Sequence, residues 1–404
     1  MSEPAATSET AAPPPDASVI IGGTPGTFAR GVLTERHPAL IRQVRDAFPY
    51  PPERLHALDA LLAEIAGGSI APLPAGAHDA EQWARWGRAY VGRSWFEVPF
   101  LWAESYFYRR LLDAVGYFAP GPWQGIDPFG PFKRAELAGD AVAGELAALD
   151  ELTQLPAEEG DMAVLHGALW GNRADLGFRI SSGEVADGTG RLLVDDGARL
   201  WRHLDADPDG TVHILADNAG RELVADLILI DHLLHTHRAG RVLLHLKPYP
   251  YFVSDATTAD VVDCVRRIAR APGRAGRIGA RLWQAMNQDR LSLRSPSFAR
   301  APLPYADLPD DLRADLATAT LTIAKGDLNY RRLVGDRHWP ATASFAALTA
   351  DFPGGPLVAL RTLKSDVVTG LDPTALAALD GSGEKWRTSG SYAVIQMRPG
   401  PGRA

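Results

Sequence analysis

The spacing of apolar residues changes character about halfway along the chain. From about residue 38 to 152 these residues recur mostly every three or four positions, as in Leu58, Leu61, Leu62 and Ile65. Such spacing predicts amphipathic helices. The alternation of apolar and polar residues that marks a half-buried strand does not appear in this stretch. We therefore predict an all-helical N-terminal region.

In the second half of the chain, short apolar runs alternate with helical patterns. Alternating strands and helices are typical of a largely parallel sheet that is covered on both faces. The pattern predicts the α/β class, with a three-layer, Rossmann-like α/β/α domain and a mainly parallel sheet. The predicted strands are 212–216, 241–246, 320–324, 357–360 and 392–397, and two of the helices between them are 221–237 and 255–269.

These patterns divide the chain into three parts. Residues 1–18 are rich in Ala, Pro, Ser, Thr and Glu and lack a core pattern, which indicates a disordered tail. We assign residues 19–190 to the helical N-terminal region and residues 191–404 to the α/β domain. A length of 404 residues suits two or three such units.

Composition excludes several classes of protein. The chain has 41 basic and 49 acidic residues, a net charge of −8, and a non-specific nucleic-acid binder would carry the opposite sign. The single cysteine, Cys264, excludes an intramolecular disulfide and a multi-thiolate metal site. No apolar run is long enough for a membrane span, and the start of the chain lacks the pattern of a secretory leader. We expect a cytoplasmic protein without a membrane or nucleic-acid partner.

Lysine is rare in this sequence. The chain has 41 Lys and Arg together, but only Lys133, Lys247, Lys325, Lys364 and Lys385 are lysines. A general cationic surface position would therefore be Arg, and a retained Lys is informative. Lys is a compact point charge on a thin stem, whereas Arg is a planar fork.

Four polar clusters each follow a predicted strand. They are Asp217-Asn218, residues 247–255, residues 325–331 and residues 361–364. Ligands of an open α/β sheet bind outside the carboxyl ends of its strands. If the strands are parallel, the four clusters meet at one edge of the sheet, and we predict the functional site there.

The residue types at this edge indicate a divalent metal and a phosphoryl group. Asp217, Asn218 and Asp255 offer hard oxygen ligands that suit Mg, Mn or a similar ion. Glu222 lies in the first turn of the next helix, where the helix dipole also favours a carboxylate, so a site role and a helix-start role stay equally open. A metal and several fixed cations together stabilise a reacting phosphoryl group. The candidate cations are Lys325, Arg331, Arg361 and Lys364, and Gly326 would let the backbone approach an anion.

A histidine-rich cluster forms a competing candidate. His232, His235 and His237 lie at the far end of the helix that begins near Gly220. At about 1.5 Å per residue, they are roughly 20 Å or more from the Asp-Asn pair. We interpret them as structural.

The polar clusters also resemble the motifs of the metal-dependent damage-control phosphatases, the family once called domain of unknown function 89. The Arg-Thr-x-Lys motif resembles subfamily III, the acidic-residue-methyltransferase-like branch. The similarity runs from about residue 26 to 397. Its motifs are Asp217-Asn218-Ala219-Gly220-x-Glu222, Lys247 with Phe252-Val253-Ser254-Asp255, Lys325-Gly326-Asp327-Leu328-Asn329-Tyr330-Arg331, Arg361-Thr362-x-Lys364, Gly26-Thr27-Phe28-Ala29, Arg36-His37-Pro38, residues 169–176, and Trp386.

The resemblance implies a helical N-terminal region on a three-layer α/β domain. It also implies a divalent metal held by Asp217, Asn218 and Asp255. The family hydrolyses phosphate esters of sugars and related metabolites. The substrate phosphate would lie against Lys364 and the segment 325–331, that is, against Lys325, Asp327, Asn329, Tyr330 and Arg331.

We therefore predict a metal-dependent phosphatase that acts on a phosphomonoester of a small metabolite, a sugar phosphate, with Mn, Mg, Co or Ni as the ion. Asp255 would orient the attacking water beside the metal ligand Asp217. The phosphate would be held by Lys364, with Arg361, Thr362, Asn329 and Glu222 completing the substrate site.

Two other functions stay open. Members of this branch have been linked to methylation of protein carboxylates by S-adenosylmethionine, and Glu222 and Asp255 would then contact that cofactor. The sequence has only Ala219-Gly220 where a glycine-rich cofactor loop is expected, so we rank this function lower. A non-catalytic protein that binds a phosphometabolite ranks last, because it would not need three metal ligands. The substrate, the ion and the oligomeric state are not determined by the sequence.

Overall fold

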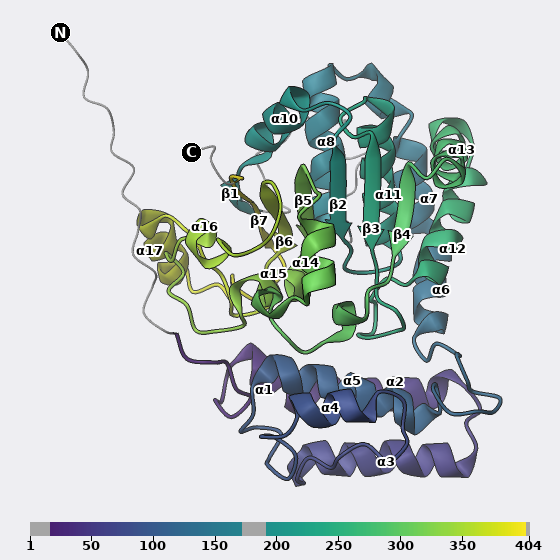
Figure 1. The fold of residues 1–404 in the computed structure, drawn as a ribbon, viewed down its shortest axis with the longest axis vertical. Helices are drawn as coiled ribbons and strands as arrows, with labels where there is room; N and C mark the ends of the chain where they lie inside the picture. Colours follow the sequence, from purple (N-terminus) through teal and green to yellow (C-terminus); the bar gives the residue numbers. More distant parts are fainter. Residues whose placement is uncertain (1–16, 172–190, 401–404) are drawn as a thin grey trace.

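The computed structural model describes residues 17–171 and 191–400. The predicted tail at 1–18 therefore lies almost wholly outside the described residues, and so do residues 172–176 of the motif that starts at Leu169. The chain forms a seven-stranded sheet with helices on both faces, and the predicted α/β class is confirmed (Figure 1).

The sheet is mainly parallel, with strand order β1-β7-β6-β5-β2-β3-β4. The five strands from β6 to β4 run parallel to their neighbours, whereas β7 is antiparallel to β6 and parallel to β1. The strands are β1 (Arg191–Asp195), β2 (Thr211–Leu215), β3 (Arg241–His245), β4 (Leu291–Arg294), β5 (Leu321–Lys325), β6 (Leu357–Thr362) and β7 (Tyr392–Arg398).

The strands that the apolar runs predicted are the central ones. All five residues of β5 are buried, because helices cover both faces of the sheet there. The sequence analysis missed β1 and β4, the two edge strands. Both are short and end in exposed polar residues such as Asp195 and Arg294, so neither stands out as an apolar run.

Two groups of helices cover the sheet and enclose separate cores. On one face lie α7 (Asp140–Ala148), α8 (Ala157–Trp170), α10 (Gly197–Ala206), α11 (Arg221–His235), α12 (Thr258–Ala269) and α13 (Gly273–Asn287). On the other lie η3 (Ser297–Arg300), η4 (Tyr305–Asp307), α14 (Asp310–Leu316), α15 (Gly326–Val334), α16 (Phe345–Leu348) and α17 (Pro373–Gly381).

The N-terminal helices form a third core, rich in aromatic side chains, below the sheet in Figure 1. The central helix α5 is buried almost all round, and its buried charged residues Glu104 and Arg109 each form an ion pair. The α6 helix connects this layer to the α/β part, and a short η2 turn precedes α8. The elements are α1 (Phe28–Gly31), η1 (Val32–Arg36), α2 (His37–Ala47), α3 (Pro52–Gly67), α4 (Ala80–Trp86), α5 (Phe100–Val115), α6 (Gly130–Ala138) and η2 (Glu151–Gln154).

The helical layer packs against the carboxyl ends of the central strands. Arg331 Nη1 of α15 lies 2.7 Å from Glu104 Oε2 of α5. The ring of Tyr108 in α5 stacks on Phe252, which follows β3, with 4.5 Å between ring centroids. The helical layer thus forms one wall of the sheet edge that carries the predicted site.

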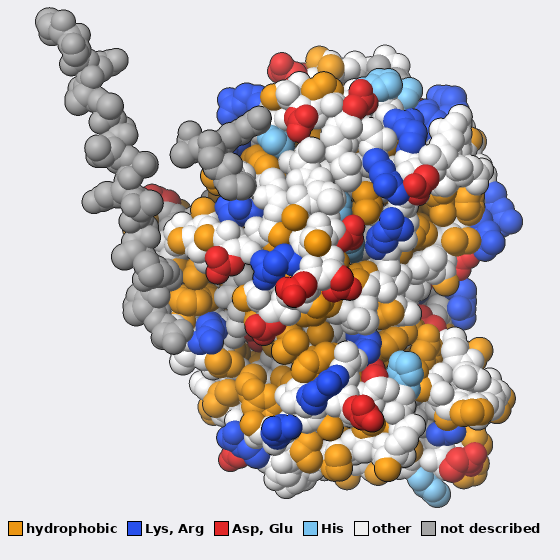
Figure 2. Space-filling view, in the orientation of Figure 1, with side chains coloured by type: hydrophobic (Ala, Val, Ile, Leu, Met, Phe, Trp, Pro, Cys, Tyr) orange, Lys and Arg blue, Asp and Glu red, His pale blue; other side chains and the backbone are white. Residues whose placement is uncertain are grey.

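The outer surface mixes both signs of charge. Figure 2 shows basic and acidic side chains interspersed over the α/β part of the face in view. None of the helices that can be described has both the length and the apolar character to cross a membrane.

Candidate functional site

The four polar clusters of the sequence meet at one edge of the sheet. Asp217 and Asn218 follow β2, the 247–255 loop follows β3, residues 325–331 run from the end of β5 into α15, and residues 361–364 end β6. The strands β3, β2, β5 and β6 are parallel neighbours, so their carboxyl ends lie side by side. The predicted convergence depended only on parallel strands, and these four strands are parallel.

Asn218 is the centre of a cluster of acidic groups, called here the acidic cluster and made of Asp217, Asn218, Glu222 and Asp255. Its Nδ2 donates to Asp217 Oδ2 at 2.9 Å and to Glu222 Oε2 at 3.0 Å. Its Oδ1 accepts a hydrogen bond from Ser254 Oγ at 2.6 Å. One amide therefore orients two carboxylates.

The backbone holds the loops after β2 and β3 together. Asn218 and Asp255 form an isolated antiparallel bridge. The Ala219 N–H donates to Ser254 O at 2.6 Å, and the Ala256 N–H donates to Asp217 O at 2.9 Å. The carboxylate of Asp255 accepts from the Phe252 N–H at 3.0 Å. The acidic cluster is thus built on two loops that are fastened to each other.

The acidic cluster carries negative charge that no neighbouring cation pairs directly. Burial, together with the charges of Glu222 and Asp255, raises the pKa of Asp217 well above its usual range. Burial also raises the pKa of Asp255, although the charge of Lys247 opposes the shift. Among the residues that the structure describes, no Lys or Arg forms an ion pair with Asp217, Glu222 or Asp255. Such a cluster is electrostatically suited to a cation.

Gly326 allows the end of β5 to approach Asp217 closely. Its φ is +79°, in the left-handed region, and a Cβ at this position would lie 1.8 Å from Asp217 Oδ2. Only glycine satisfies both the backbone conformation and the contact. The N-terminus of α15, with its unpaired N–H groups and positive dipole end, therefore lies against the acidic cluster.

Lys364 differs from the other cations at this edge. It is partly exposed and forms no hydrogen bond or ion pair with any part of the chain that is described. Its charge nevertheless lowers the pKa of Asp217, which places it near the acidic cluster. Thr362, the last residue of β6, is half-buried beside it.

Arg361, which is fully buried, and Asp327, which is partly buried, form an ion pair. Arg361 Nη2 lies 2.7 Å from Asp327 Oδ1, and Ser365 Oγ donates to the same oxygen at 3.0 Å. The guanidinium is fully buried and stacks over the ring of Tyr330 at 4.3 Å. Burial acts to raise the pKa of Asp327, but the charges of Arg361 and Arg331 outweigh it, and the pKa falls below its usual value.

Two other predicted substrate residues hold strand ends in place. Asn329 Nδ2 donates to the carbonyls of Leu215, Ala216 and Lys325, at 2.9–3.2 Å. Lys325 Nζ lies 2.7 Å from Asp226 Oδ1 in α11 and also donates to the Ala168 carbonyl. The side chains of Asn329 and Lys325 are thus occupied within the protein.

Tyr330 and Arg331 also have partners away from the acidic cluster. The Tyr330 hydroxyl donates to Gln396 Oε1 at 2.8 Å. Arg331 Nε donates to Asp336 Oδ1 at 2.7 Å and Nη1 donates to Glu104 Oε2 at 2.7 Å. The structure brings this segment to the sheet edge but directs these polar atoms into the protein, because α15 presents them on its buried faces.

The sequence analysis missed the contribution of α6. Lys133 Nζ donates to the backbone carbonyl of Asp255 at 2.8 Å and pairs with Asp127 and Asp260, each at 3.1 Å. Glu136, one turn on, lies against Gly220, where a Cβ would be 2.3 Å from its Oε2. The rarity of lysine was the one signal that could have pointed to Lys133.

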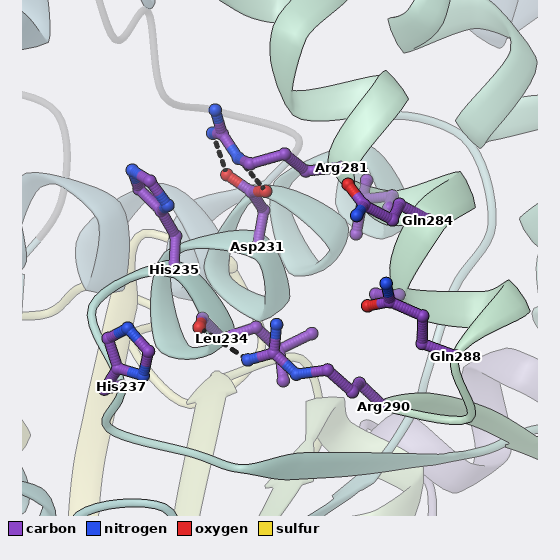
Figure 3. Close-up of a pocket in the computed structure, with 10 residues that line it drawn as sticks. Asp231, Leu234, His235, His237, Arg281, Gln284, Gln288 and Arg290 are labelled. Carbon is purple, nitrogen blue, oxygen red and sulfur yellow. Dashed lines mark hydrogen bonds and ion pairs between the residues drawn. The ribbon is translucent and has the colours of Figure 1, made fainter.

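The histidine-rich end of α11 lines a separate pocket of about 140 Å³. Figure 3 shows Asp231 bridged by Arg281, with Arg290 Nη2 donating to the Leu234 carbonyl at 2.9 Å. His235 and His237 border this pocket at the opposite end of α11 from the acidic cluster.

Comparisons with known proteins agree with the resemblance of the motifs. A family model described as the damage-control phosphatase ARMT1-like domain matches residues 32–378. Damage-control phosphatase ARMT1 of Danio rerio is 32% identical over 336 residues, which cover 75% of this chain and 74% of that protein. The Homo sapiens protein of the same name is 30% identical over 336 residues, covering 75% of each. A crystal structure of a duf89 family protein from Pyrococcus horikoshii superimposes with a TM-score of 0.47 at 16% identity, covering 91% of this chain and 98% of that chain.

Proposed function

The chain belongs to the damage-control phosphatase ARMT1-like family and is a phosphatase, and from this premise we propose that it hydrolyses sugar phosphates with a divalent metal ion at the acidic cluster. The observation that carries the proposal is the contrast at the sheet edge. Among the residues that the structure describes, three buried carboxylates lack a cationic partner there, and a lysine beside them lacks an anionic one.

The residues of the acidic cluster fit a divalent ion. Asp217, Asn218 and Asp255 offer oxygen ligands only, as hard cations such as Mg²⁺ and Mn²⁺ require. The raised pKa of Asp217 reflects negative charge that a bound cation would relieve. When bound, such an ion polarises a phosphoryl oxygen and lowers the pKa of a coordinated water.

Asp255 is the residue we assign to orient the attacking water. Its raised pKa brings it nearer to the range in which a carboxylate accepts a proton efficiently at neutral pH. The charge of Lys247 opposes that shift and keeps the carboxylate able to ionise. Lys133 holds the backbone of Asp255 from the other side, so it acts as a positioning residue.

The phosphate is assigned to Lys364 and the N-terminus of α15. The Lys364 ammonium is free of other partners within the described chain, and the first turn of α15 offers N–H groups to an anion. Three side chains fix the strand ends around this position. They are Arg361 on β6, Asp327 directly after β5, and Asn329, which donates to the end of β2. They act as positioning residues in this proposal.

The leaving group would lie against an aromatic wall. Phe252 is partly exposed, stacks on Tyr108 and lies next to the loop that carries Asp255. A flat aromatic face beside polar loop residues suits the apolar face of a sugar ring. The ring of Phe252 also stacks on Tyr251, and this apolar wall is compatible with a sugar phosphate, the substrate class that the resemblance of the motifs implies.

A phosphate-release assay tests the proposed function. The purified chain is incubated with a panel of phosphorylated sugars and nucleotides, with Mg, Mn, Co or Ni, and without S-adenosylmethionine. We expect phosphate release from sugar phosphates that stops in excess chelator. Absence of release from the whole panel, together with transfer of labelled methyl groups from S-adenosylmethionine to a protein carboxylate, would reverse the assignment.

A further inference from the structure

A second group of metal-ligating side chains lies on the face of the sheet, apart from the acidic cluster. His213 in β2 and His245 at the end of β3 are on adjacent parallel strands, and Asp315 comes from α14, which covers that face. One ligand atom from each of the three lies within 4.8 Å of the others. Among the described residues, this is the one group of three His, Cys, Asp or Glu side chains whose ligand atoms meet that distance; the carboxylates of the acidic cluster lie farther apart.

The two imidazoles are buried. His213 Nε2 lies 3.5 Å from Thr318 Oγ1, whereas His245 is only partly satisfied. His245 Nε2 lies 3.1 Å from His213 Nδ1, so one hydrogen bond can join the rings. His245 Nδ1 is buried without a hydrogen-bond partner in the described chain, and so is the hydroxyl of Thr322, which is in register with His213 on β5. A buried hydroxyl without a partner is costly, so Thr322 beside His213 points to a missing partner there, whereas the unpartnered His245 Nδ1 lies across the ring from Nε2, the nitrogen that faces His213.

We propose that His213, His245 and Asp315 bind a transition-metal ion of the Zn²⁺ class. Two imidazoles and one carboxylate form a donor set that suits Zn²⁺ and leaves one position open. Tetrahedral bonds of about 2.0–2.1 Å place two ligand nitrogens about 3.3 Å apart, close to the observed separation.

The charges around this site permit a cation. Burial lowers the pKa of His245 to about 3, so its ring is neutral and has a lone pair for a metal. The negative charge of Asp315 opposes the lowering of the His213 pKa, whereas the positive charges of Arg294 and Arg241 add to it. Arg241 is itself paired with Asp289 at 2.6 Å. The ion would cross-link β2 and β3 to α14 on the face of the sheet, apart from the edge that carries the acidic cluster.

Zinc titration of the full-length chain tests this site independently of the phosphatase site. Asp217→Ala is used as the parent, because it removes a ligand of the acidic cluster. After treatment with chelator, calorimetry with Zn²⁺ alone should show one ion bound per chain. Asp315→Asn and His245→Gln, each added to the parent, should weaken this binding on the order of 100-fold, because each removes a ligand.

Asp311→Asn is the matched control, since Asp311 is an exposed acid on the same helix and lies outside the group. It should bind Zn²⁺ as the parent does. Asp315 is only partly buried, so its variant tests the site even if His245→Gln fails to fold. X-ray absorption of the zinc-loaded parent should show two imidazole ligands. Absence of saturable binding, or equal affinity in the parent and Asp315→Asn, would overturn the proposal.

Discussion

Two neighbouring regions of the same sheet edge differ in whether their acidic side chains have an ion-pair partner. At the ends of β2 and β3, Asp217 and Asp255 are buried beside each other without an ion pair in the described chain, and the pKa of each is raised. At the ends of β5 and β6, Asp327, whose side chain is 14% exposed, is paired with the fully buried Arg361, and its pKa is lowered. Both regions hold carboxylates that are at least partly buried, so burial alone does not explain the difference.

The difference indicates separate tasks. A carboxylate with a bonded cation is satisfied in the empty protein, and removing either partner destabilises the fold. Crowded carboxylates without such a partner raise each other's pKa, and a cation bound from solution would relieve their repulsion. We therefore assign the first region to metal binding and the second mainly to holding the site in shape.

The largest effect on stability is expected from Arg361→Met. Removing the guanidinium leaves Asp327 partly buried and unpaired, which should lower the free energy of unfolding by about 3–5 kcal/mol. Chemical denaturation measures the change. Adding Asp327→Asn to this variant removes the lone charge and should recover part of the loss. A loss below about 1 kcal/mol, the range of surface pairs, would show that the pair does not hold the fold.

Lys364→Arg should keep the charge and still lose most phosphatase activity, about 10-fold or more. A compact ammonium can reach a phosphoryl oxygen beside a metal, whereas a guanidinium fork needs a different approach. Lys385→Arg is the control, because Lys385 is exposed and outside the site. Turnover and thermal midpoint are measured for both variants. Wild-type turnover in Lys364→Arg would show that charge alone is required.

Gly326→Ala and Gly335→Ala separate backbone strain from contact with the acidic cluster. Both glycines have positive φ, at opposite ends of α15, so each alanine should cost about 1–3 kcal/mol of strain. The nearest atom to a Cβ at Gly335 is 3.8 Å away, whereas at Gly326 it is Asp217 Oδ2. Only Gly326→Ala should lose Mn²⁺ affinity and activity. Equal losses in both variants would contradict a role for the close approach.

The smallest effect is a difference in pH dependence. In the metal-free folded protein the pKa of Asp217 is raised, so the folded state binds more protons than the unfolded state above the unfolded value. The free energy of unfolding should therefore fall as the pH rises from the unfolded pKa of Asp217 to its raised folded pKa, and it should fall less in Asp217→Ala. Asp327 acts in reverse: its contribution is present above its unfolded pKa and is lost as the pH falls through the lowered value. Thermal midpoints in chelator from about pH 2 to 8 measure both, and parallel curves for wild type and Asp217→Ala would contradict this reasoning.

The sequence predicted the central strands and their common edge because buried parallel strands form apolar runs and the polar clusters follow them directly. It did not predict which way each side chain on α15 points. Asn329 and Arg331 have the residue types of a phosphate site, yet they bind strand carbonyls and partner acids. The contribution of Lys133 depends on packing between segments 122 residues apart, which no local pattern encodes.

A Mn²⁺ titration of three proteins tests the central claim most directly. Calorimetry and thermal unfolding are measured for the wild type, Asp217→Ala and Asp327→Asn. The account predicts that Asp217→Ala loses Mn²⁺ binding while its metal-free thermal midpoint is kept or raised, and that Asp327→Asn keeps Mn²⁺ affinity while its midpoint falls. Unchanged Mn²⁺ affinity in Asp217→Ala, or loss of affinity without loss of stability in Asp327→Asn, would contradict the division between the two regions.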